Sequence, residues 1–418
     1  MSEAPRLPVE EAVSRIIDTV PRLPTEEVPL RAAVGRVLAE QIDAAYTHPA
    51  WRNSAMDGYA VHADDVRGAT RESPVSLTVR GTIAAGDIAP SVIHAGTAWR
   101  IMTGAQVPDN IDTVVRVEDT DAGTERVLIH DDRDATRNIR PSGEDFRAGH
   151  RLMLYGTVMR PAHVALAAAN GRRTVLAIRK PRVAILTSGN ELVDVDQFED
   201  VLTGRRIINT NGYALAAAVQ DAGGVPIPLG IATDDPADIA ARITGAPEFD
   251  VLITSGGISV GAFDYTRDVV QRLGASLDFW RVRMRPGGPF GFGMLGTRPW
   301  FGLPGNPVST MVTFEVFVRP ALRFMGVHIP LWRDACDVTL AESVSTPGGL
   351  THFLRAVVDG DRVARLTGPQ GSALMTSMMS ANALLIVPHN VPYLDAGAAA
   401  RAMLLQPGYP QPAVPWTY

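Results

Sequence analysis

A glycine-rich turn that directly follows an apolar run has the residue types needed to bind an oxyanion. The run from Phe249 to Thr254 leads into Ser255-Gly-Gly-Ile-Ser-Val-Gly261, and Asp264 lies just beyond it. Where a buried parallel strand ends in such a turn, backbone N–H groups stay free and the next helix adds its positive N-terminal end, which suits a phosphate. A carboxylate at Asp264 could then hold a hard cation against that anion.

Taken alone this turn is weak evidence, because glycine-rich turns after strands more often serve structure than ligand binding. It also lacks the middle glycine of a dinucleotide fingerprint and the Lys-Ser or Lys-Thr pair of a P-loop. Two further segments repeat its design, however. The β-branched run from Arg182 ends in Thr-Ser-Gly and reaches Glu191. The run from Pro299 ends in Leu-Pro-Gly-Asn-Pro, and a helix is predicted after it, from Val308 to Met325.

Three strand ends with polar turns, separated by helical patterns, predict a doubly wound α/β domain over residues 179–326. Its site is expected at the carboxyl ends of the strands. Two carboxylates, Glu191 and Asp264, would repel a bound anion unless a cation intervened, so the pattern favours Mg²⁺ bridging carboxylate and phosphate oxygens. The structural alternative for each carboxylate is capping of the following helix.

Composition narrows the class of protein. The 418 residues carry a formal net charge of −6 without a dominant basic stripe, which argues against nucleic acid as the main partner. No apolar run reaches the roughly 18 residues of a membrane helix, and the acidic start lacks a signal-peptide core, so we expect a cytoplasmic protein without a membrane partner. Cys336 is the only cysteine, and the nine histidines show no metal-ligand spacing, so neither a disulfide within the chain nor zinc chemistry is supported.

Six sequence blocks together resemble one family, the molybdopterin molybdenumtransferases that include MoeA and the gephyrin E domain. Three of them lie in the predicted α/β domain: Ser255 to Tyr265, Met284 to Pro289, and Gly302 to Ser309. The other three lie upstream: Asn53 to Ala60, Arg100 to Ala105, and Arg140 to Asp145. Because all six occur in the family's order, the resemblance is highly specific.

The resemblance implies four domains. Residues 1–44 and 141–178 would form an elongated helical domain, 45–140 an inserted β-rich domain, 179–326 the α/β molybdopterin-binding domain, and 327–418 a C-terminal β-barrel. Local patterns predict helices through the first forty residues, with the clearest from Pro8 to about Val20, and a further helix from Pro161 to Ala169. They predict β-segments at Leu77 to Arg80 and at Thr113 to Val117.

The resemblance also implies a reaction and partners. Molybdenum from molybdate would be inserted into adenylylated molybdopterin, with magnesium-dependent cleavage of the phosphoanhydride and release of AMP. A homodimer is implied in which Asp57 of one subunit meets Asp264 of the other, and transient contact with other enzymes of molybdenum cofactor synthesis is expected. Two alternatives stay open: the preceding adenylylation step, which would consume ATP, and a non-enzymatic scaffold.

By the same resemblance the site residues fall into groups by role. The catalytic group is Asp57, Asp145, Glu191 and Asp264. The substrate-binding group is Thr103, Ser255, Gly256, Gly257, Ser259, Gly261, Pro304, Gly305, Asn306 and Pro307. The metal ligands are Glu191, Asp234 and Asp264. The molybdate-binding group is Arg281, Arg283, Arg285, Ser309, Arg355 and Ser380.

Simpler roles compete for the residues outside the α/β loops. Asp57 could merely form a turn, Thr103 could cap one, and Asp145 could be a solvated loop carboxylate. Asp234 precedes Asp235 and a proline, where Asp235 itself is expected to cap a helix.

The three arginines at period two predict one charged face of a strand. Such a face is usually solvated, yet Arg binds tetrahedral oxyanions well. Gly288 stands where some family members carry Lys, so Arg283 or Arg285 would have to replace that cation. Asn190 stands where relatives often have Asp, which removes one possible metal ligand.

Overall fold

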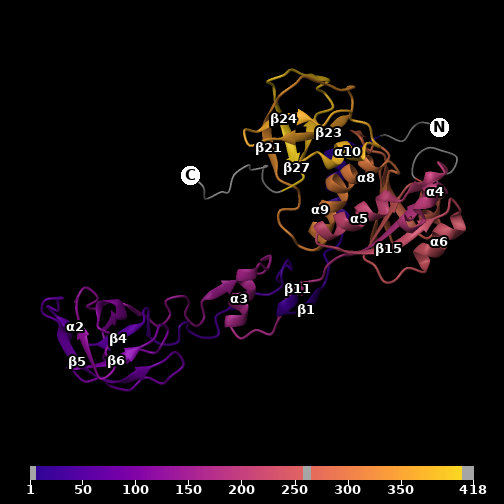
Figure 1. Ribbon diagram of the computed structural model, residues 1–418. Helices are drawn as coiled ribbons and strands as arrows, with labels where there is room; N and C mark the ends of the chain where they lie inside the picture. The colour runs from indigo at the N-terminus through magenta and orange to yellow at the C-terminus, as the bar shows by residue number, and fades with distance from the viewer. Residues whose placement is uncertain (1–5, 258–264, 407–418) are drawn as a thin grey trace. The chain divides into compact units, whose positions relative to one another are not determined.

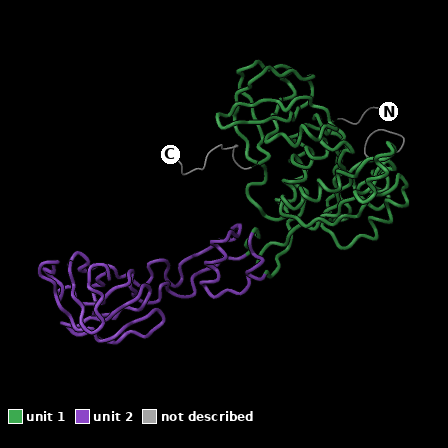
Figure 2. Tube along the Cα trace, viewed as in Figure 1, with its two compact units in different colours: residues 1–28, 35–39, 176–418 green, residues 29–34, 40–175 purple. Residues whose placement is uncertain are grey.

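The computed structural model describes residues 6–257 and 265–406 of the chain (Figure 1). The chain divides into two compact units (Figure 2). Unit 1 comprises residues 1–28, 35–39 and 176–418, and unit 2 comprises residues 29–34 and 40–175. Within the described ranges, no helix combines the length and apolar character that crossing a bilayer requires.

A six-stranded sheet forms the framework of unit 1, in the order β15-β12-β16-β20-β19-β17. Its strands are β12 (Arg182–Ser188), β15 (Val225–Ala232), β16 (Val251–Ser255), β17 (Ala275–Trp280), β19 (Gly291–Leu295) and β20 (Arg298–Leu303). The first four strands in the spatial order are parallel, β19 is antiparallel to its neighbour β20, and β17 is antiparallel to β19. From β12 the chain crosses to β15 on one side and returns to β16 on the other, so the topological switch point lies between β12 and β16.

Helices pack against this sheet and bury its central strands. All five residues of β16 are buried, as expected for a central parallel strand. Helices α6 (Pro236–Thr244) and α7 (Tyr265–Arg272) join one core cluster with strand residues such as Leu186 and Leu252. Helix α5 (Thr210–Asp221) packs instead against α8 (Pro307–Thr313) as well as β12 and β15. The predicted α/β fold is thus confirmed for this part of the chain.

Two helices agree with the predictions from the sequence. Asp235 caps α6 by accepting the N–H of Ala237 at 2.9 Å, and Pro236 is the first helical residue. Helix α8 continues through a π-helical turn, Phe314–Val318, into α9 (Arg319–Met325). The helix predicted from Val308 to Met325 therefore exists, with one wider turn in its middle.

The C-terminal part of unit 1 closes into a β-barrel, as predicted. Its five strands are β21 (Ala335–Leu340), β23 (Thr351–Val358), β24 (Val363–Leu366), β25 (Ala383–Val387) and β27 (Ala399–Leu404). The ring closes because β25 pairs with both β27 and β23. Strand β18 (Met284–Arg285) extends β23. The short elements β22 (Val344–Ser345), α10 (Met375–Met379) and β26 (Tyr393–Leu394) complete this region.

The segments predicted to form an elongated helical domain contain short strands as well as helices. Helix α1 (Val9–Thr19) confirms the first helix and packs against α9 within unit 1. It ends because Pro21 holds Val20 in an extended conformation, so the prediction of helix through the first forty residues is wrong. The rest of these segments holds one α-helix, α3 (Pro161–Ala169), and the elements β1 (Thr25–Pro29), η1 (Leu30–Ala32), β2 (Ile42–Asp43), β10 (Arg151–Met153) and β11 (Thr174–Ile178).

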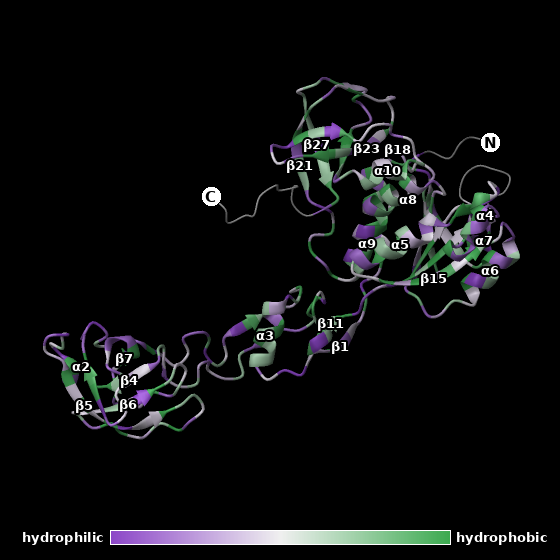
Figure 3. Ribbon diagram, in the orientation of Figure 1, coloured by the Kyte–Doolittle hydropathy of each residue, from purple (hydrophilic) through white to green (hydrophobic). Residues whose placement is uncertain are grey.

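Unit 2 contains a five-stranded sheet in the order β7-β4-β6-β5-β8. The strands are β4 (Gly58–Val61), β5 (Val75–Ile83), β6 (Thr97–Ile101), β7 (Thr113–Arg116) and β8 (Arg126–Ile129), which confirms both predicted β-segments. Strand β4 is buried at every position. Figure 3 shows both hydrophobic (green) and hydrophilic (purple) stretches around its label. Short elements flank the sheet: β3 (Asn53–Ser54), α2 (Ala63–Val66), η2 (Val117–Asp119) and β9 (Ile139–Arg140).

Asp134 and Arg116 form an ion pair beside this sheet, in which the carboxylate is buried and the guanidinium is partly exposed. The Asp134 side chain is 1% exposed and accepts two hydrogen bonds of 2.8 Å from the Arg116 guanidinium. Burial alone would raise the pKa of Asp134, but the bonds from Arg116 outweigh it and lower this pKa to about 2. Because the folded-state pKa lies below the unfolded value of about 3.9, the pair stabilises the fold above pH 4 and that contribution is lost as pH falls toward 2.

We therefore expect Asp134→Asn to remove part of the acid sensitivity of unit 2. Between pH 5 and pH 2 the wild-type protein should lose about 2 kcal/mol more unfolding free energy than the variant. Denaturant unfolding at several pH values measures this difference. Equal pH slopes for the two proteins would contradict the assignment.

Candidate active site

The carboxyl ends of three parallel strands lie level with one another at the switch point. Thr187 of β12 pairs with Ser255 of β16, and Ser255 pairs with Leu303 of β20. The loops that follow these strands therefore leave the sheet at one edge. Three segments that are far apart in the sequence, each predicted to contribute to a site, are brought together there.

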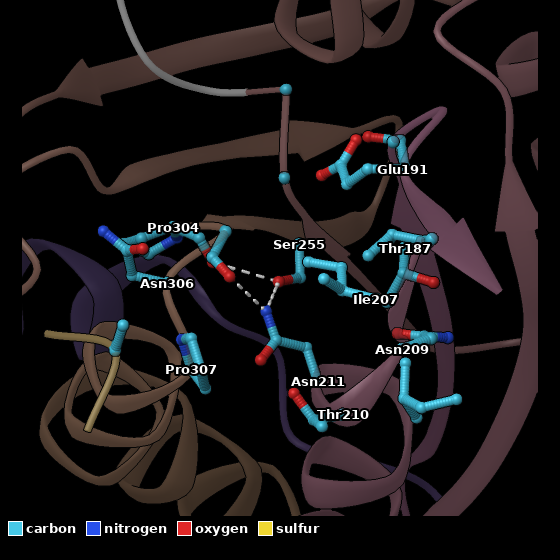
Figure 4. Close-up of a pocket in the computed structure, with 18 of the residues that line it drawn as sticks. Thr187, Glu191, Ile207, Asn209, Thr210, Asn211, Ser255, Pro304, Asn306 and Pro307 are labelled. Carbon is cyan, nitrogen blue, oxygen red and sulfur yellow. Dashed lines mark hydrogen bonds between the residues drawn. The ribbon is translucent and has the colours of Figure 1, made fainter. Parts of the chain in front are cut away.

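These loops line a pocket of ≈ 920 Å³ within unit 1 (Figure 4). Its lining includes ten residues predicted from the sequence: Glu191, Asp234, Ser255, Gly256, Gly257, Pro304, Gly305, Asn306, Pro307 and Ser309. It also includes residues that the sequence analysis missed, among them Val201, Ile207, Ile208, Asn209, Thr210, Asn211, Ala373 and Met375. A signal for part of this set was present, since Asn209 before a helical pattern is a typical N-cap.

A small parallel pair of strands holds Glu191 in place. The pair consists of β13 (Leu192–Val193) and β14 (Ile207–Ile208), which are connected through η3 (Val195–Gln197) and α4 (Phe198–Leu202). The Ile207 N–H donates to the Glu191 carbonyl at 2.9 Å. The Glu191 carboxylate lies over Gly189, where a β-carbon would come within 2.7 Å of both carboxylate oxygens. The acid is thus held directly above the loop that ends β12.

The turn after β16 requires glycine at two consecutive positions. Gly256 has a φ of +93°, and a β-carbon there would lie 2.5 Å from the carbonyl oxygen of Ser188. Gly257 has a φ of +61°, and its β-carbon would lie 2.4 Å from the Thr266 hydroxyl. Both the backbone conformation and the space exclude a side chain, so the backbone itself forms this wall of the pocket.

The pocket is acidic, because its lining among the described residues includes Glu191 and Asp234 but neither Lys nor Arg. Asp234 accepts the N–H of Asn190 at 3.1 Å, and its own N–H donates to the Asn190 side chain at 3.1 Å. Carboxylate oxygens are the ligands that Mg²⁺ prefers, and Mg²⁺ completes its shell with water and ligand phosphate. The donor set therefore fits Mg²⁺, although the described residues include no group of three His, Cys, Asp or Glu able to hold a metal.

An asparagine at the start of α5 connects the walls of the pocket (Figure 4). Asn211 Nδ2 donates to Ser255 Oγ at 2.9 Å and to the Gly305 carbonyl at 2.8 Å. Ser255 Oγ in turn donates to the Pro304 carbonyl at 3.0 Å. The Thr310 hydroxyl donates to the same carbonyl at 2.6 Å. These bonds tie the first turn of α5 and the end of β16 to the turn between β20 and α8.

In unit 2 two residues that were predicted separately, Asp57 and Thr103, are hydrogen-bonded to each other. Asp57 Oδ1 accepts the Thr103 N–H at 2.7 Å and the Thr103 hydroxyl at 2.8 Å. The bond from the Thr103 backbone is the main cause that lowers the pKa of Asp57, and the hydroxyl adds to it. Asp57 is exposed, so an ionised and oriented carboxylate is presented on the surface of this unit.

Asp145 lies in the same unit as Asp57 but in a different loop. In the antiparallel pair of β3 and β9, Asn53 faces Arg140. Asp57 follows β3 and Asp145 follows β9, and because these strands are antiparallel the chain leaves the pair at opposite ends. The Asp145 N–H donates to the His48 carbonyl at 3.2 Å, and its side chain is exposed. This arrangement agrees better with the solvated-loop alternative.

The prediction that the three arginines share one face of a continuous strand is wrong. Arg281 has a φ of +103°, which breaks the strand, and only Met284–Arg285 is regular. At this break the segment bonds to the N-terminal part of the chain: the Leu7 N–H donates to the Arg281 carbonyl at 3.2 Å, and the Arg283 N–H donates to the Leu7 carbonyl at 2.8 Å. The three arginines are absent from the pocket lining described above.

The structure also corrects the prediction of a molybdate contact for Arg355. This side chain is 0% exposed, and its guanidinium donates four hydrogen bonds of 3.0 to 3.2 Å to the carbonyls of residues 369–371 and to Ser377. Burial lowers the pKa of Arg355. Its donors are used within the barrel, where they hold the segment that leads to Ala373 in the pocket.

Ser380, predicted to bind molybdate, does not line the pocket. The Ser380 hydroxyl donates to the Thr376 carbonyl at 3.0 Å at the end of α10, away from the pocket lining. Ser259, Gly261 and Asp264 lie outside the described residues. Of the predicted molybdate ligands, Ser309 is the one that lines the pocket.

Family models match the chain over most of its length. A model of the MoeA N-terminal region (domains I and II) matches residues 7–171. A model of a probable molybdopterin binding domain matches residues 184–323, and a model of the MoeA C-terminal region (domain IV) matches residues 337–405.

Individual relatives cover nearly the whole chain. Molybdopterin molybdenumtransferase 2 from Mycobacterium tuberculosis is 39% identical over 378 residues, which are 88% of this chain and 92% of that protein. Molybdopterin molybdenumtransferase from Bacillus subtilis is 34% identical over 408 residues, 96% of this chain and 94% of that protein. The crystal structure of the molybdopterin biosynthesis moeA protein from Pyrococcus horikoshii OT3 matches with a TM-score of 0.77 at 29% identity, covering 96% of this chain and all of that one.

Proposed function

The chain belongs to the MoeA family of molybdopterin molybdenumtransferases, and from this premise we propose that its switch-point pocket binds adenylylated molybdopterin. The protein acts in molybdenum cofactor biosynthesis as a molybdopterin molybdenumtransferase. The observation that carries the finer proposal is the pocket itself. Its walls are glycine-rich turns at strand ends, which suit a phosphate-bearing ligand, and its volume of ≈ 920 Å³ falls in the range of small-molecule sites.

Mg²⁺ would be held by Glu191 and Asp234, which both line the pocket, with Asp264 as a further ligand. When bound, Mg²⁺ neutralises phosphate charge and polarises the phosphorus–oxygen bond that is cleaved. The chain's own contribution is to position the ligand and to exclude competing geometries. The Asn190–Asp234 pair and the β13–β14 pair keep both acids in place, so little reorganisation is needed during the reaction.

Cys336, the only cysteine of the chain, lies on β21 of the barrel. The sulfur ligands of molybdenum must therefore come from the dithiolene of the substrate. Molybdate would enter beside Ser309, the residue of the molybdate group that lines the pocket. AMP would leave as water adds at phosphorus and the phosphoanhydride P–O bond breaks, so that AMP and molybdopterin each keep one phosphate.

The direct test incubates the purified protein with adenylylated molybdopterin, Mg²⁺ and molybdate. We expect AMP release together with reactivation of a cofactor-free molybdoenzyme. Consumption of ATP with unmodified molybdopterin, in place of AMP release, would assign the chain to the adenylylation step. If neither AMP release nor ATP consumption is observed, the proposed reaction is overturned.

We further propose that the active enzyme is a homodimer in which Asp57 of one subunit completes the pocket of the other. The supporting observation is that Asp57 is oriented by two hydrogen bonds from Thr103 and yet exposed, as expected of a group that meets a ligand. Within one chain Asp57 lies in unit 2 and the pocket in unit 1.

A subunit-mixing experiment tests this shared site. Asp57→Ala and Glu191→Ala homodimers should each be inactive. A heterodimer isolated through two different tags should regain about half of wild-type turnover, because one of its two composite sites is intact. A heterodimer as inactive as its parents would place the whole site within one subunit.

A further inference from the structure

The turn between β20 and α8 offers two backbone donors whose direction is set by their neighbours. The carbonyl of Pro304 is held by Ser255 and Thr310, and the carbonyl of Gly305 is held by Asn211. In a trans peptide the N–H points opposite to the preceding carbonyl. The three cis peptide bonds of the described chain lie elsewhere, before Pro49, Pro286 and Pro330.

The Asn306 N–H therefore points away from Asn211, and the Gly305 N–H points away from Ser255 and Thr310. Within the described ranges neither N–H donates to another group of the protein. Both residues line the pocket and are exposed. Asn306 keeps an extended conformation, with a φ of −67° and a ψ of 126°, because Pro307 follows it. Two adjacent, unpaired donors in a rigid turn are the arrangement that receives a tetrahedral oxyanion.

The amide of Asn211 has only one orientation that satisfies these contacts. The Gly305 carbonyl can only accept a hydrogen bond, so the amide nitrogen must face it. The Asn211 Oδ1 is then buried and accepts no hydrogen bond from the described residues, while the residue as a whole is 9% exposed. A buried acceptor without a partner is costly and uncommon. The Asn211 side chain thus keeps its hydrogen bond to the Gly305 carbonyl although its own Oδ1 is left without a partner among the described residues.

We infer that Asn211 is a positioning residue: it fixes the turn at residues 304–307 so that the Gly305 and Asn306 N–H groups bind a tetrahedral oxyanion in the pocket. This inference rests on the proposed function, which supplies two such oxyanions, the phosphate of the substrate and molybdate. Asn211 touches neither in this role. It acts through the two carbonyls, and Ser255 relays its effect to Pro304.

Hydrogen exchange of the full chain can isolate these two donors. Pro304 and Pro307 have no N–H, so the only exchangeable backbone amides in residues 304–307 are those of Gly305 and Asn306. In the wild-type protein, either sodium molybdate or inorganic phosphate should slow exchange in this segment at least fivefold. Protection by molybdate alone would assign the donors to molybdate, and protection by phosphate alone would assign them to the substrate phosphate.

The Asn211→Asp variant removes the donor and places a carboxylate oxygen against the Gly305 carbonyl. We expect this variant to lose the protection and to bind the same oxyanion at least tenfold more weakly. Asn382→Asp is the matched control, since Asn382 is also 9% exposed and donates to a carbonyl, that of Val358 at 2.8 Å, within the barrel. It should retain the protection even if it lowers the melting temperature.

If Asn211→Asp does not fold, Ser255→Ala keeps the Asn211–Gly305 bond and should give partial loss of protection. No protection by either oxyanion in the wild-type protein, or full protection in Asn211→Asp, would overturn the inference. The two proposals fail in distinguishable ways. AMP release by the wild-type protein without protection of this segment rejects only the role of Asn211, whereas absence of AMP release rejects the proposed function itself.

Discussion

Replacing Glu191 by Gln should lower AMP release by about 10²–10³-fold at moderate Mg²⁺ concentration. The substitution keeps the size of the side chain but removes the charge of one of the two carboxylates in a pocket lined by no described Lys or Arg. Phosphate charge then lacks part of its neutralisation. Because the backbone of Glu191 is held by the β13–β14 pair, the loop should keep its shape. The loss should therefore appear in magnesium dependence rather than in folding.

Initial rates of AMP release over a range of Mg²⁺ concentrations measure this effect. We expect the apparent Mg²⁺ requirement of Glu191→Gln to rise and part of the rate to return at saturation. Glu199→Gln is the matched control, because Glu199 is an exposed acid in the first turn of α4 outside the pocket lining. Wild-type magnesium dependence in Glu191→Gln would remove this residue from the metal site.

Replacing Gly256 by Ala should lower activity by about 10²-fold or more, the effect expected when reacting groups are displaced by about 1 Å. The new β-carbon would lie 2.5 Å from the Ser188 carbonyl oxygen, a backbone atom at the end of β12. Relief of the clash must move the turn after β16 or the loop after β12. Both loops line the pocket.

The matched control for this variant is Gly274→Ala. Gly274 has a φ of +96°, close to the +93° of Gly256, but its β-carbon would meet no atom within 4 Å. Both variants bear the strain of a left-handed residue, about 1–2 kcal/mol. Only Gly256→Ala should also lose turnover. Turnover and unfolding free energy measured together separate the two effects, and equal losses of turnover in both variants would refute the steric explanation.

Features that depend on neighbours in the sequence were predictable. The strand-to-glycine turns, the cap at Asp235 and the helix through Met325 each follow from a few adjacent residues. Alternation of side-chain types could not reveal the break at Arg281, where φ is +103°, nor the backbone hydrogen bonds that join this segment to Leu7.

Arg355 illustrates the limit for charged residues. A guanidinium suits an oxyanion in any sequence-based argument, but the same five donors also suit backbone carbonyls. The choice between these partners depends on burial, and Arg355 is fully enclosed by the barrel. The residues next to an arginine in a β-rich segment do not indicate whether its side chain will be buried against backbone carbonyls or left free to bind a ligand.

The sequence by itself determined the chemistry at the strand ends, because a turn's glycines and carboxylates are encoded side by side and act through their own backbone. It also determined the family, since six blocks in order are highly specific. Only the tertiary structure decided which residues support that chemistry. Asn211 reaches Gly305 across 94 positions, and Asp57 reaches Thr103 across 46. Such bonds form because folding brings distant segments within hydrogen-bonding distance. Sequence periodicity describes only neighbouring residues, so it cannot predict them.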